Sequence, residues 1–438
     1  ILKKMKERIA IISGFRSPMG KAGGALKNIN ASDLGARIAK EVLLRSNIDV
    51  KLIDEAIIGN VAQPADSANI SRVIALKAGL TKEVSAYTVH RNCASGMEAF
   101  TTAFAKINAG YGNLMLVGGV ESMSNIPLFY GKKMVEIFTK LSKSKTAIEK
   151  IRSFNGFKFH HLNPVLGLVQ GLTDPISGLI MGCTAENVAR DLLVSRQEQD
   201  EFALNSHIKA QNATEKNIFK AEIIPIFNND EKNSQMIEED EGIRKNQKIE
   251  DLQKLKPYFE KVAGSVTVGN SSQITDGSAF ALVAKESYAK KLQQEFGFEI
   301  LGYLTEFAYA GLEPSKMGLG PVHATKKLLD KTNLKLSDFD LVEINEAFSA
   351  QVLGCLRAFA SEEYCSEHFN LSSPLGEINE DIVNVNGGAI ALGHPVGMSG
   401  ARIIIHLLRE LKRQGKNRGL ASLCIGGGQG GACLLEVN

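Results

Sequence analysis

The alternation of two hydrophobic periods along this 438-residue chain limits its fold more than any other feature. In the first 120 and the last 140 residues, strand-like apolar runs alternate with stretches whose apolar residues recur every three or four positions. This alternation is typical of α/β architecture, in which helices pack over a sheet. Residues 43–60 and 328–345 also share a pattern of helix end, loop, acidic turn and a strand that ends in Asn. We therefore expect two halves built on one plan.

Residues 125–261, which lie between these halves, differ from them in composition. They are rich in Lys, Asn and Glu, contain few strand signals, and are too long for a plain connection. We interpret them as an inserted loop domain. The predicted division is an N-terminal half of residues 1–124 and 262–297, the loop domain, and a C-terminal half of residues 298–438.

Composition and charge exclude several classes of protein. A formal net charge of +3, without zinc-finger or aromatic-basic patterns, argues against a nucleic-acid partner. The six cysteines form no CxxC pair and no cluster with histidine, so neither a disulfide framework nor a metal site is expected. The longest nearly uncharged stretches, residues 162–185 and 384–401, are interrupted by Gly and Pro and predict no membrane span. We expect reduced thiols, no N-terminal targeting segment, and a cytoplasmic location, or the mitochondrial matrix in a eukaryote.

Residues 132–158 carry a local excess of six positive charges. Two glutamates accompany eight lysines and arginines, at positions 132, 133, 140, 143, 145, 150, 152 and 158, and apolar residues are interspersed. The pattern is typical of a solvated helical face over an apolar seam, which we favour. It also fits peripheral contact with an anionic membrane surface, or attraction of an acidic ligand.

Cys93 lies where a thiol is most easily activated, between a predicted strand at residues 84–89 and a predicted helix at residues 94–108. Unpaired N–H groups and the positive end of the helix dipole favour a thiolate at such a position. A free cysteine is otherwise commonly a small buried hydrophobic residue. We therefore treat Cys93 as a candidate nucleophile, provided that other segments complete a site.

Three other segments carry candidate groups at the ends of strand-like runs. His394 precedes a helical run in a glycine-rich turn, which suits a general base or an oxyanion donor. Cys424 ends a strand before glycines whose N–H groups suit an oxyanion hole. Asn345 could hold a water or an oxyanion, and Glu346 could orient a neighbouring imidazole. Since open α/β sheets bind ligands at the carboxyl ends of their strands, we expect one shared pocket.

The glycines after Cys424 also match a dinucleotide-binding fingerprint, at Gly426, Gly428 and Gly431. That fingerprint requires a following helix and an acidic residue about 20 positions further on. Here a strand-like run follows instead, and we reject the nucleotide interpretation.

Together these segments resemble the thiolase family, and the resemblance covers nearly the whole chain. The matching segments are RSP at 16–18, NCASG at 92–96, GGVESMS at 118–124, MGCTAE at 181–186, GSVTVGNSSQITDG at 264–277, NEAF at 345–348, GGAIALGHP at 387–395 and CIGGGQG at 424–430. The resemblance implies a five-layered αβαβα fold of two similar halves, with a loop domain that shapes a coenzyme A site.

The resemblance also implies a role for each residue. Cys93 would attack an acyl thioester with the help of His394, and Cys424 would act as acid and base. One oxyanion site would use His394 with a water held by Asn345, and the other the backbone N–H groups of Cys93 and Gly426. Coenzyme A would be a co-substrate, with no tightly bound cofactor. Its expected contacts are Ser272, Met181 and Phe348.

Different segments of the chain resemble two different subtypes of the family. The insertion after Ser124 and the stretch 361–381 are similar to the thiolase subunit of the trifunctional complex of fatty-acid oxidation, which implies a hydratase-dehydrogenase partner. The NEAF and CIGGG segments are more similar to short-chain acetoacetyl thiolases. This similarity implies, as an alternative, an acetoacetyl-CoA thiolase that works in the synthetic direction. The family further implies a homodimer or tetramer.

An inactive thiolase-like protein that binds coenzyme A or lipid is the alternative of another class. The presence of both cysteines and His394 argues against it.

Overall fold

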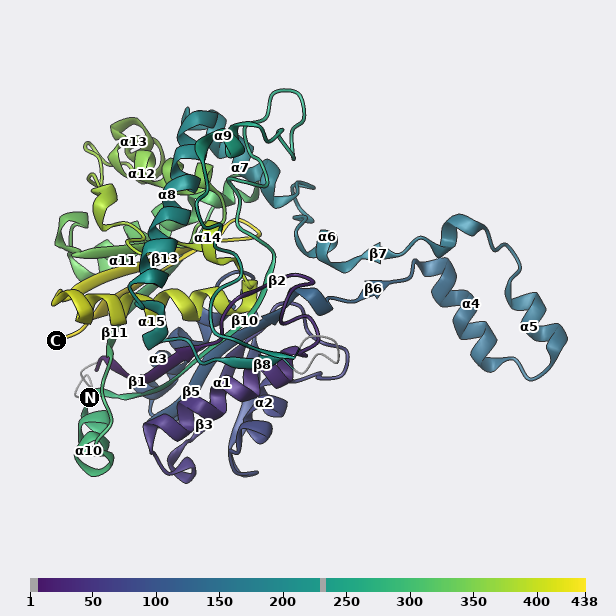
Figure 1. The fold of residues 1–438 in the computed structure, drawn as a ribbon, viewed down its shortest axis with the longest axis horizontal. Coiled ribbons are helices and arrows are strands. Elements are labelled where there is room, and N and C mark those ends of the chain that lie inside the picture. The colour runs from purple at the N-terminus through teal and green to yellow at the C-terminus, as the bar shows by residue number, and fades with distance from the viewer. Residues whose placement is uncertain (1–6, 229–233) are drawn as a thin grey trace.

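The structure, a computed structural model, describes residues 7–228 and 234–438 (Figure 1). Residues 1–6, where we expect no targeting segment, lie outside the described residues. None of the helices in the described part of the chain is long and apolar enough to cross a membrane.

The N-terminal half is built on five strands of a mixed sheet. Their spatial order is β1 (Ile9–Arg16), β10 (Thr275–Lys285), β5 (Leu114–Ser122), β3 (Glu55–Gly59) and β4 (Ser85–Val89). β3 is parallel to both β4 and β5, whereas β10 is antiparallel to both of its neighbours. The short β2 (Gly20–Lys21) pairs with β10.

The C-terminal half continues the same sheet. Its strands follow in the order β11 (Gly302–Gly311), β14 (Gln429–Glu436), β13 (Arg418–Ile425) and β12 (Leu341–Ile344). Antiparallel pairing between the first residues of β1 and of β11 joins the two halves.

Alternating residues of the strands face two different apolar clusters. In β5, Leu114 and Leu116 face the cluster with α1 (Ala31–Ser46) and α2 (Ile70–Ala78). Met115 and Val117 face the cluster that contains α3 (Ser95–Ala109) and α15 (Val396–Gln414). Because side chains alternate across a strand, each half of the sheet is covered on both faces.

The helices and strands form five layers. α1 and α2 cover the outer face of the N-terminal strands, and α3 with α15 lie between the two sets of strands. α11 (Gly320–Thr332) and α12 (Ser349–Ala360) cover the outer face of the C-terminal strands. Each fully buried Leu, Ile or Phe of these layers contributes about 1.5–3 kcal/mol. The predicted αβαβα arrangement is confirmed.

α3 and α15 touch at glycines near their N-termini. A Cβ atom added at Gly96 would lie 2.7 Å from the backbone nitrogen of Ala401, and one at Gly400 would lie 2.5 Å from that of Met97. Only glycine lets the two helix starts approach this closely. The two helix N-termini that carry Cys93 and His394 are thereby brought together.

The predicted repeat is present in both halves. α1 and α11 each end at an asparagine in the left-handed conformation, Asn47 at φ 54° and Asn333 at φ 56°. A short 3-10 turn and then β3 or β12 follow, and the next residue is Asn60 or Asn345. Asparagine adopts positive φ more readily than most residues, which explains the two matching helix ends.

Residues 125–261 contain short strands and separate helices, and the expected domain boundaries stay a prediction. The helices of this stretch are α4 (Lys132–Lys143), α5 (Ala147–Ser153), α6 (Gly167–Gly171), α7 (Met181–Asp191), α8 (Arg196–Glu215) and α9 (Ile249–Gln253). Its strands are β6 (Leu128–Phe129), β7 (Val165–Leu166), β8 (Ile226–Asn228) and β9 (Gln235–Ile237). The remaining helices outside it are α10 (Glu286–Phe296), α13 (Glu362–Phe369) and α14 (Ala389–Leu392).

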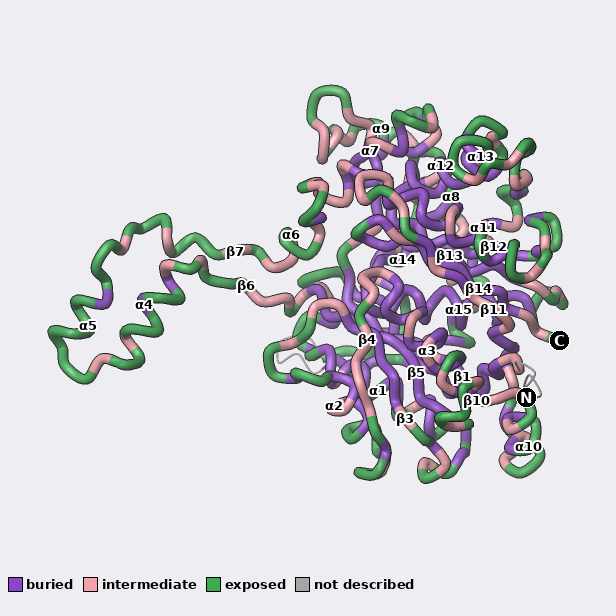
Figure 2. Tube along the Cα trace, turned by 180° about the vertical axis from the view of Figure 1, so that it is seen from behind, coloured by how far each residue is buried: buried purple, intermediate pink, exposed green. Residues whose placement is uncertain are grey.

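Residues 126–166, here called the excursion, extend away from the body of the molecule (Figures 1 and 2). The excursion runs out along β6, turns through α4 and α5, and returns along β7. Within it only Met134, Ile137 and Ser153 are buried. The expected apolar seam is therefore covered in part, and many of its apolar side chains face solvent.

Candidate active site

Cys93 lies in a tight turn that joins β4 to α3. The preceding residue, Asn92, has a φ of 44°, and Ser95 Oγ accepts from the Arg91 N–H at 2.9 Å and donates to the Asn92 carbonyl at 2.7 Å. Asn92 Nδ2 donates to the carbonyl of Gly426 at 2.6 Å. This bond ties the Cys93 turn to the glycine loop of the other half, a link that sequence reasoning missed.

The thiol of Cys93 is half-buried, and its burial raises its pKa. The backbone N–H groups of Gly426 and of Cys93 itself favour the thiolate but do not outweigh the burial. The N–H groups act in the expected direction, but burial has the larger effect on the pKa of the thiol. Attack by Cys93 requires a base that takes its proton.

His394 is buried and neutral. Burial lowers the pKa of His394 to about 4, and the charge of Arg402 adds to this effect. Ring atom Nδ1 pairs with Ser399 Oγ at 2.6 Å, and the backbone N–H donates to the carbonyl of Gln273 at 3.0 Å. Nε2 is buried without a hydrogen-bond partner among the described residues. A neutral imidazole with one free nitrogen can accept a proton from a bound group or a nearby thiol.

Ser399, in the first turn of α15, orients the imidazole. We expected Glu346 to do so, and this expectation is wrong. The Glu346 carboxylate accepts hydrogen bonds from the Ser206 hydroxyl, the Asn384 amide and the Ile390 N–H. It therefore fixes the stretch ahead of His394 and not the ring itself.

Asn345 follows β12 and is fully buried. Its N–H donates to the Ser422 carbonyl at 2.9 Å, while neither side-chain amide atom has a partner among the described residues. An unpaired buried polar group costs about 1–3 kcal/mol. Such a cost is expected where the amide forms its hydrogen bonds with a bound molecule.

Cys424 is the next-to-last residue of β13 and is also buried. Burial raises the pKa of Cys424 well above its usual value, and the neighbouring Cys93 adds to this effect. Cys424 packs in an apolar cluster with Met181 and Phe348. A thiol with a raised pKa keeps its proton and can donate it to a carbanion.

A pocket of about 620 Å³ opens beside Cys93. Of the predicted site residues, Gly426 and Met181 line it together with Cys93. The others do not: His394, Cys424, Asn345, Ser272 and Phe348. Its apolar lining comes largely from the base of the excursion and the segments around it: Val61, Met123, Ile126, Pro127, Phe129, Leu168, Leu172, Ile176 and Val396.

Ser272 and Phe348 lie in two segments that are bonded to each other. Ser272 is partly exposed, and its N–H donates to the carbonyl of Ala347 at 2.9 Å. The ring of Phe348 meets that of Phe259 edge to face at 6.1 Å. The predicted coenzyme A contacts thus belong to one region, around the NEAF segment and Met181.

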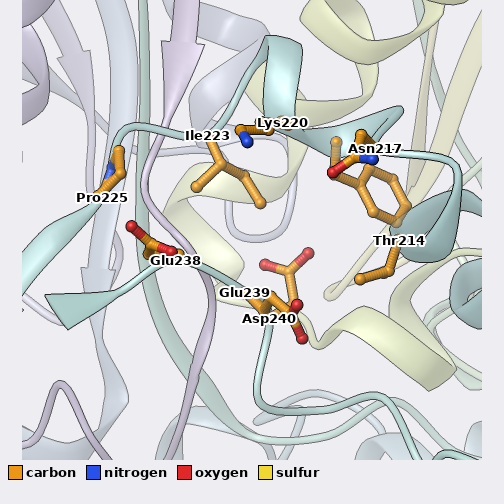
Figure 3. A pocket seen from close by; sticks show the side chains of 9 residues that line it. Thr214, Asn217, Lys220, Ile223, Pro225, Glu238, Glu239 and Asp240 are labelled. Atoms are coloured by element: carbon orange, nitrogen blue, oxygen red, sulfur yellow. The ribbon is translucent and has the colours of Figure 1, made fainter.

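A separate hollow between the end of α8 and β9 contains none of the predicted site residues (Figure 3). Of its acidic groups, Asp240 is already paired with the buried Arg16 guanidinium at 2.7 Å. Within the described residues no group of three or more His, Cys, Asp or Glu side chains could hold a metal ion.

Comparison with known proteins identifies the family. The model of the thiolase N-terminal domain matches residues 9–287, and that of the thiolase C-terminal domain matches residues 298–437. The chain is 39% identical to a 3-ketoacyl-CoA thiolase of Pseudoalteromonas translucida and 37% identical to one of Yersinia enterocolitica, covering 100% of this chain and 98% of each relative.

Solved structures agree with this assignment. An acetyl-CoA acetyltransferase of Bacillus anthracis superimposes with a TM-score of 0.85 at 35% identity over 100% of both chains. A human mitochondrial 3-ketoacyl-CoA thiolase in complex with CoA gives a TM-score of 0.83 at 34% identity, over 99% of this chain and 98% of the other. The chain belongs to the thiolase family.

Proposed function

We propose that this enzyme cleaves 3-ketoacyl-CoA with coenzyme A to give acetyl-CoA and a shortened acyl-CoA, through an acyl group on Cys93. One observation carries the proposal: Cys93 faces the Gly426 loop in an apolar pocket, and the other half holds buried polar atoms, on Asn345 and His394, that have no hydrogen-bond partner among the described residues. These atoms suit the oxygens of a thioester.

The first half-reaction starts with proton transfer from Cys93 to His394 Nε2. The Cys93 sulfur attacks the 3-keto carbon, and the N–H groups of Cys93 and Gly426 stabilise the alkoxide that forms. When the alkoxide collapses, the bond between carbons 2 and 3 breaks. The electron pair moves into the thioester carbonyl, whose oxygen is held by His394 and a water on Asn345, and Cys424 protonates carbon 2.

The second half-reaction uses the same groups in reverse. Cys424, now a thiolate, takes the proton of the coenzyme A thiol. The coenzyme A sulfur attacks the acyl carbonyl on Cys93, the alkoxide again sits at the Cys93 and Gly426 N–H groups, and Cys93 leaves. His394 returns a proton to Cys93. Coenzyme A is a co-substrate in this scheme, bound near Ser272, Met181 and Phe348, and no tightly bound cofactor is required.

The apolar lining from the excursion supports an acyl chain longer than acetyl at the 3-keto end. The test is thiolysis of short, medium and long 3-ketoacyl-CoA substrates, combined with mass analysis of Cys93. We expect acylated Cys93 and cleavage of medium and long chains. Cleavage and synthesis restricted to acetoacetyl-CoA would favour a short-chain enzyme of the synthetic direction. Coenzyme A binding without acylation at any length would indicate an inactive binding protein.

The excursion favours a second, peripheral role, contact with an anionic membrane surface. Ile148, Ile151 and Phe159 are 64%, 75% and 85% exposed, and lysines surround them. Exposed apolar side chains next to cations suit the headgroup region of an anionic bilayer. Sedimentation with anionic vesicles at low and high salt, against neutral vesicles, tests this role. Absence of binding at both salt concentrations refutes it.

We also propose a homodimer or tetramer, a hydratase-dehydrogenase partner subunit, and a cytoplasmic or mitochondrial-matrix location. The insertion after Ser124 supports the partner subunit through its resemblance to trifunctional thiolases. Sedimentation velocity of the chain alone and with such a subunit tests both assemblies.

A further inference from the structure

The two halves of the sheet each place one residue at the same point of their common plan. In the C-terminal half, Ile344 of β12 pairs with Ser422 of β13, and Cys424 lies two residues beyond. In the N-terminal half, Gly59 of β3 pairs with Gly119 of β5, and two residues beyond is Glu121.

The antiparallel neighbours agree with this correspondence. Gly430 of β14 lies opposite Cys424, and Gly277 of β10 lies opposite Glu121. Glu121 therefore stands in the nucleophile's half where the proposed acid-base cysteine stands in the other. The reaction scheme above gives Glu121 no role.

The carboxylate of Glu121 is completely buried and accepts four N–H bonds. The donors are the Asn60 amide at 3.1 Å and the backbone N–H groups of Val61, Ala62 and Gly397, each at 3.0 Å. All four donors are neutral N–H groups, and two of them bond each carboxylate oxygen. Both oxygens must therefore be acceptors.

These donors belong to two segments that reach the catalytic pocket. Val61 and Ala62 line the pocket together with Cys93. Gly397 lies in the first turn of α15, three residues after His394, and its neighbour Val396 lines the same pocket. The carboxylate thus bonds the wall beside the nucleophile to the turn that carries the base.

The contact between the first turn of α15 and β5 leaves no room for added side-chain atoms. A Cβ atom at Gly119 would lie 2.0 Å from the Gly397 carbonyl oxygen, and one at Gly397 would lie 2.7 Å from a Glu121 oxygen. The first turn of α15 therefore packs directly on β5. A carboxylate at a helix N-terminus is also favoured by the helix dipole.

We propose that Glu121 is a positioning residue of the acyl-transfer reaction, which holds the His394 turn against the wall beside Cys93 so that imidazole and thiol keep their reacting geometry. The Glu121 carboxylate already accepts four N–H bonds from the segments beside Cys93 and His394, so it acts by positioning and not on the substrate. The inference rests on the proposed thiolase reaction.

The test compares wild type, Glu121→Gln and Glu121→Asp by steady-state thiolysis and by single-turnover acylation of Cys93. Gln keeps the volume but replaces one acceptor oxygen by a donor, while Asp keeps the charge but shortens the reach. We expect both folded variants to lose about 10²-fold in kcat and in acylation rate, because misplacement by about 1 Å costs that much. The KM for the acyl-CoA should stay within about threefold, because the pocket lining is unchanged.

Glu222→Gln is the matched control, since Glu222 is equally buried but bonds Arg16 and His406 away from the pocket. It should lower the melting temperature and leave kcat per folded molecule unchanged. A kcat within about twofold of wild type in folded Glu121→Gln would overturn the inference, as would a raised KM with unchanged kcat. If the Gln variant does not fold, the Asp variant is judged by the same criteria. Wild type without thiolysis would instead refute the proposed function.

Discussion

The body of the molecule and the excursion use the same residue types in opposite ways. In the body, Phe100 and Phe280 are 1% and 0% exposed, whereas Phe154 and Phe159 of the excursion are 45% and 85% exposed. The difference lies in what covers each helix. The two sets of strands enclose α3 and α15, while α4 and α5 contact mainly each other (Figure 2). An apolar stripe thus predicts an amphipathic helix but not its partner.

Cys93 lies in the body of the molecule, and Cys93→Ala should have the largest effect on activity. We expect kcat for thiolysis to fall by at least about 10⁴-fold, because no other group can form the acyl intermediate. Calorimetry should still detect coenzyme A binding. Cys365→Ala, which removes a buried thiol away from the pocket, is the control and should remain active. Normal turnover by Cys93→Ala would refute the nucleophile.

Cys424→Ala should separate the two half-reactions. With an acyl-CoA donor, acylation of Cys93 should persist to one equivalent, because a coenzyme A thiolate can leave without an acid. Turnover of 3-ketoacyl-CoA should fall by about 10³-fold, because carbon 2 is no longer protonated and coenzyme A is no longer deprotonated. Mass analysis of the trapped protein and a thiolysis assay measure the two quantities. Unchanged turnover would remove the acid-base role from Cys424.

Asn345→Ala should lower kcat by about 10²- to 10³-fold, the usual cost of one oxyanion donor. The unfolding free energy should rise or stay constant, because the substitution removes a buried amide that has no partner in the described part of the chain. Thermal unfolding and kinetics on the same sample measure both. A large loss of stability together with normal kcat would indicate a structural role.

His394 should make the protein sensitive to acid. Burial lowers the pKa of His394 to about 4, so the unfolded chain binds the proton first as the pH falls. The stability present above the ordinary histidine pKa of about 6.5 is therefore lost between about pH 6.5 and pH 4. Denaturant titrations should show that wild type loses about 3 kcal/mol more than His394→Gln over this interval. Parallel pH curves for the two proteins would contradict the prediction.

The smallest effect is expected in the excursion. Ile151→Ala should change the unfolding free energy by less than about 0.5 kcal/mol, because the side chain is 75% exposed. Its matched counterpart in the body, Ile404→Ala, removes a fully buried side chain and should cost about 2–5 kcal/mol. Equal losses would mean that the excursion is covered by a partner in solution.

Much of the fold could be predicted because its signals are local. The strand before Cys93 and the helix after it were expected at residues 84–89 and 94–108, and the structure has Ser85–Val89 and Ser95–Ala109. The repeat in the two halves was visible because each copy ends in the same short pattern of turn, strand and Asn.

The site geometry could be predicted only in part because it depends on contacts distant in sequence. The Asn92 to Gly426 bond spans 334 positions, and the Glu121 to Gly397 bond spans 276. The direction of the net pKa shift of Cys93 could not be predicted, because burial, which opposes the N–H groups of Cys93 and Gly426, is a property of the packed molecule. The serine that orients His394 had a local signal, a hydroxyl in the first turn of the following helix, which was overlooked.

Because α3 and α15 meet at a glycine contact, catalytic activity reports whether the two halves of the chain have docked. Nucleophile and base belong to different halves of the chain, and the helix starts beside them touch where Gly96 and Gly400 allow it. A molecule in which either half has unfolded locally keeps all of its catalytic side chains but should be inactive. During refolding, turnover should therefore return together with the last docking event and not with the formation of helices.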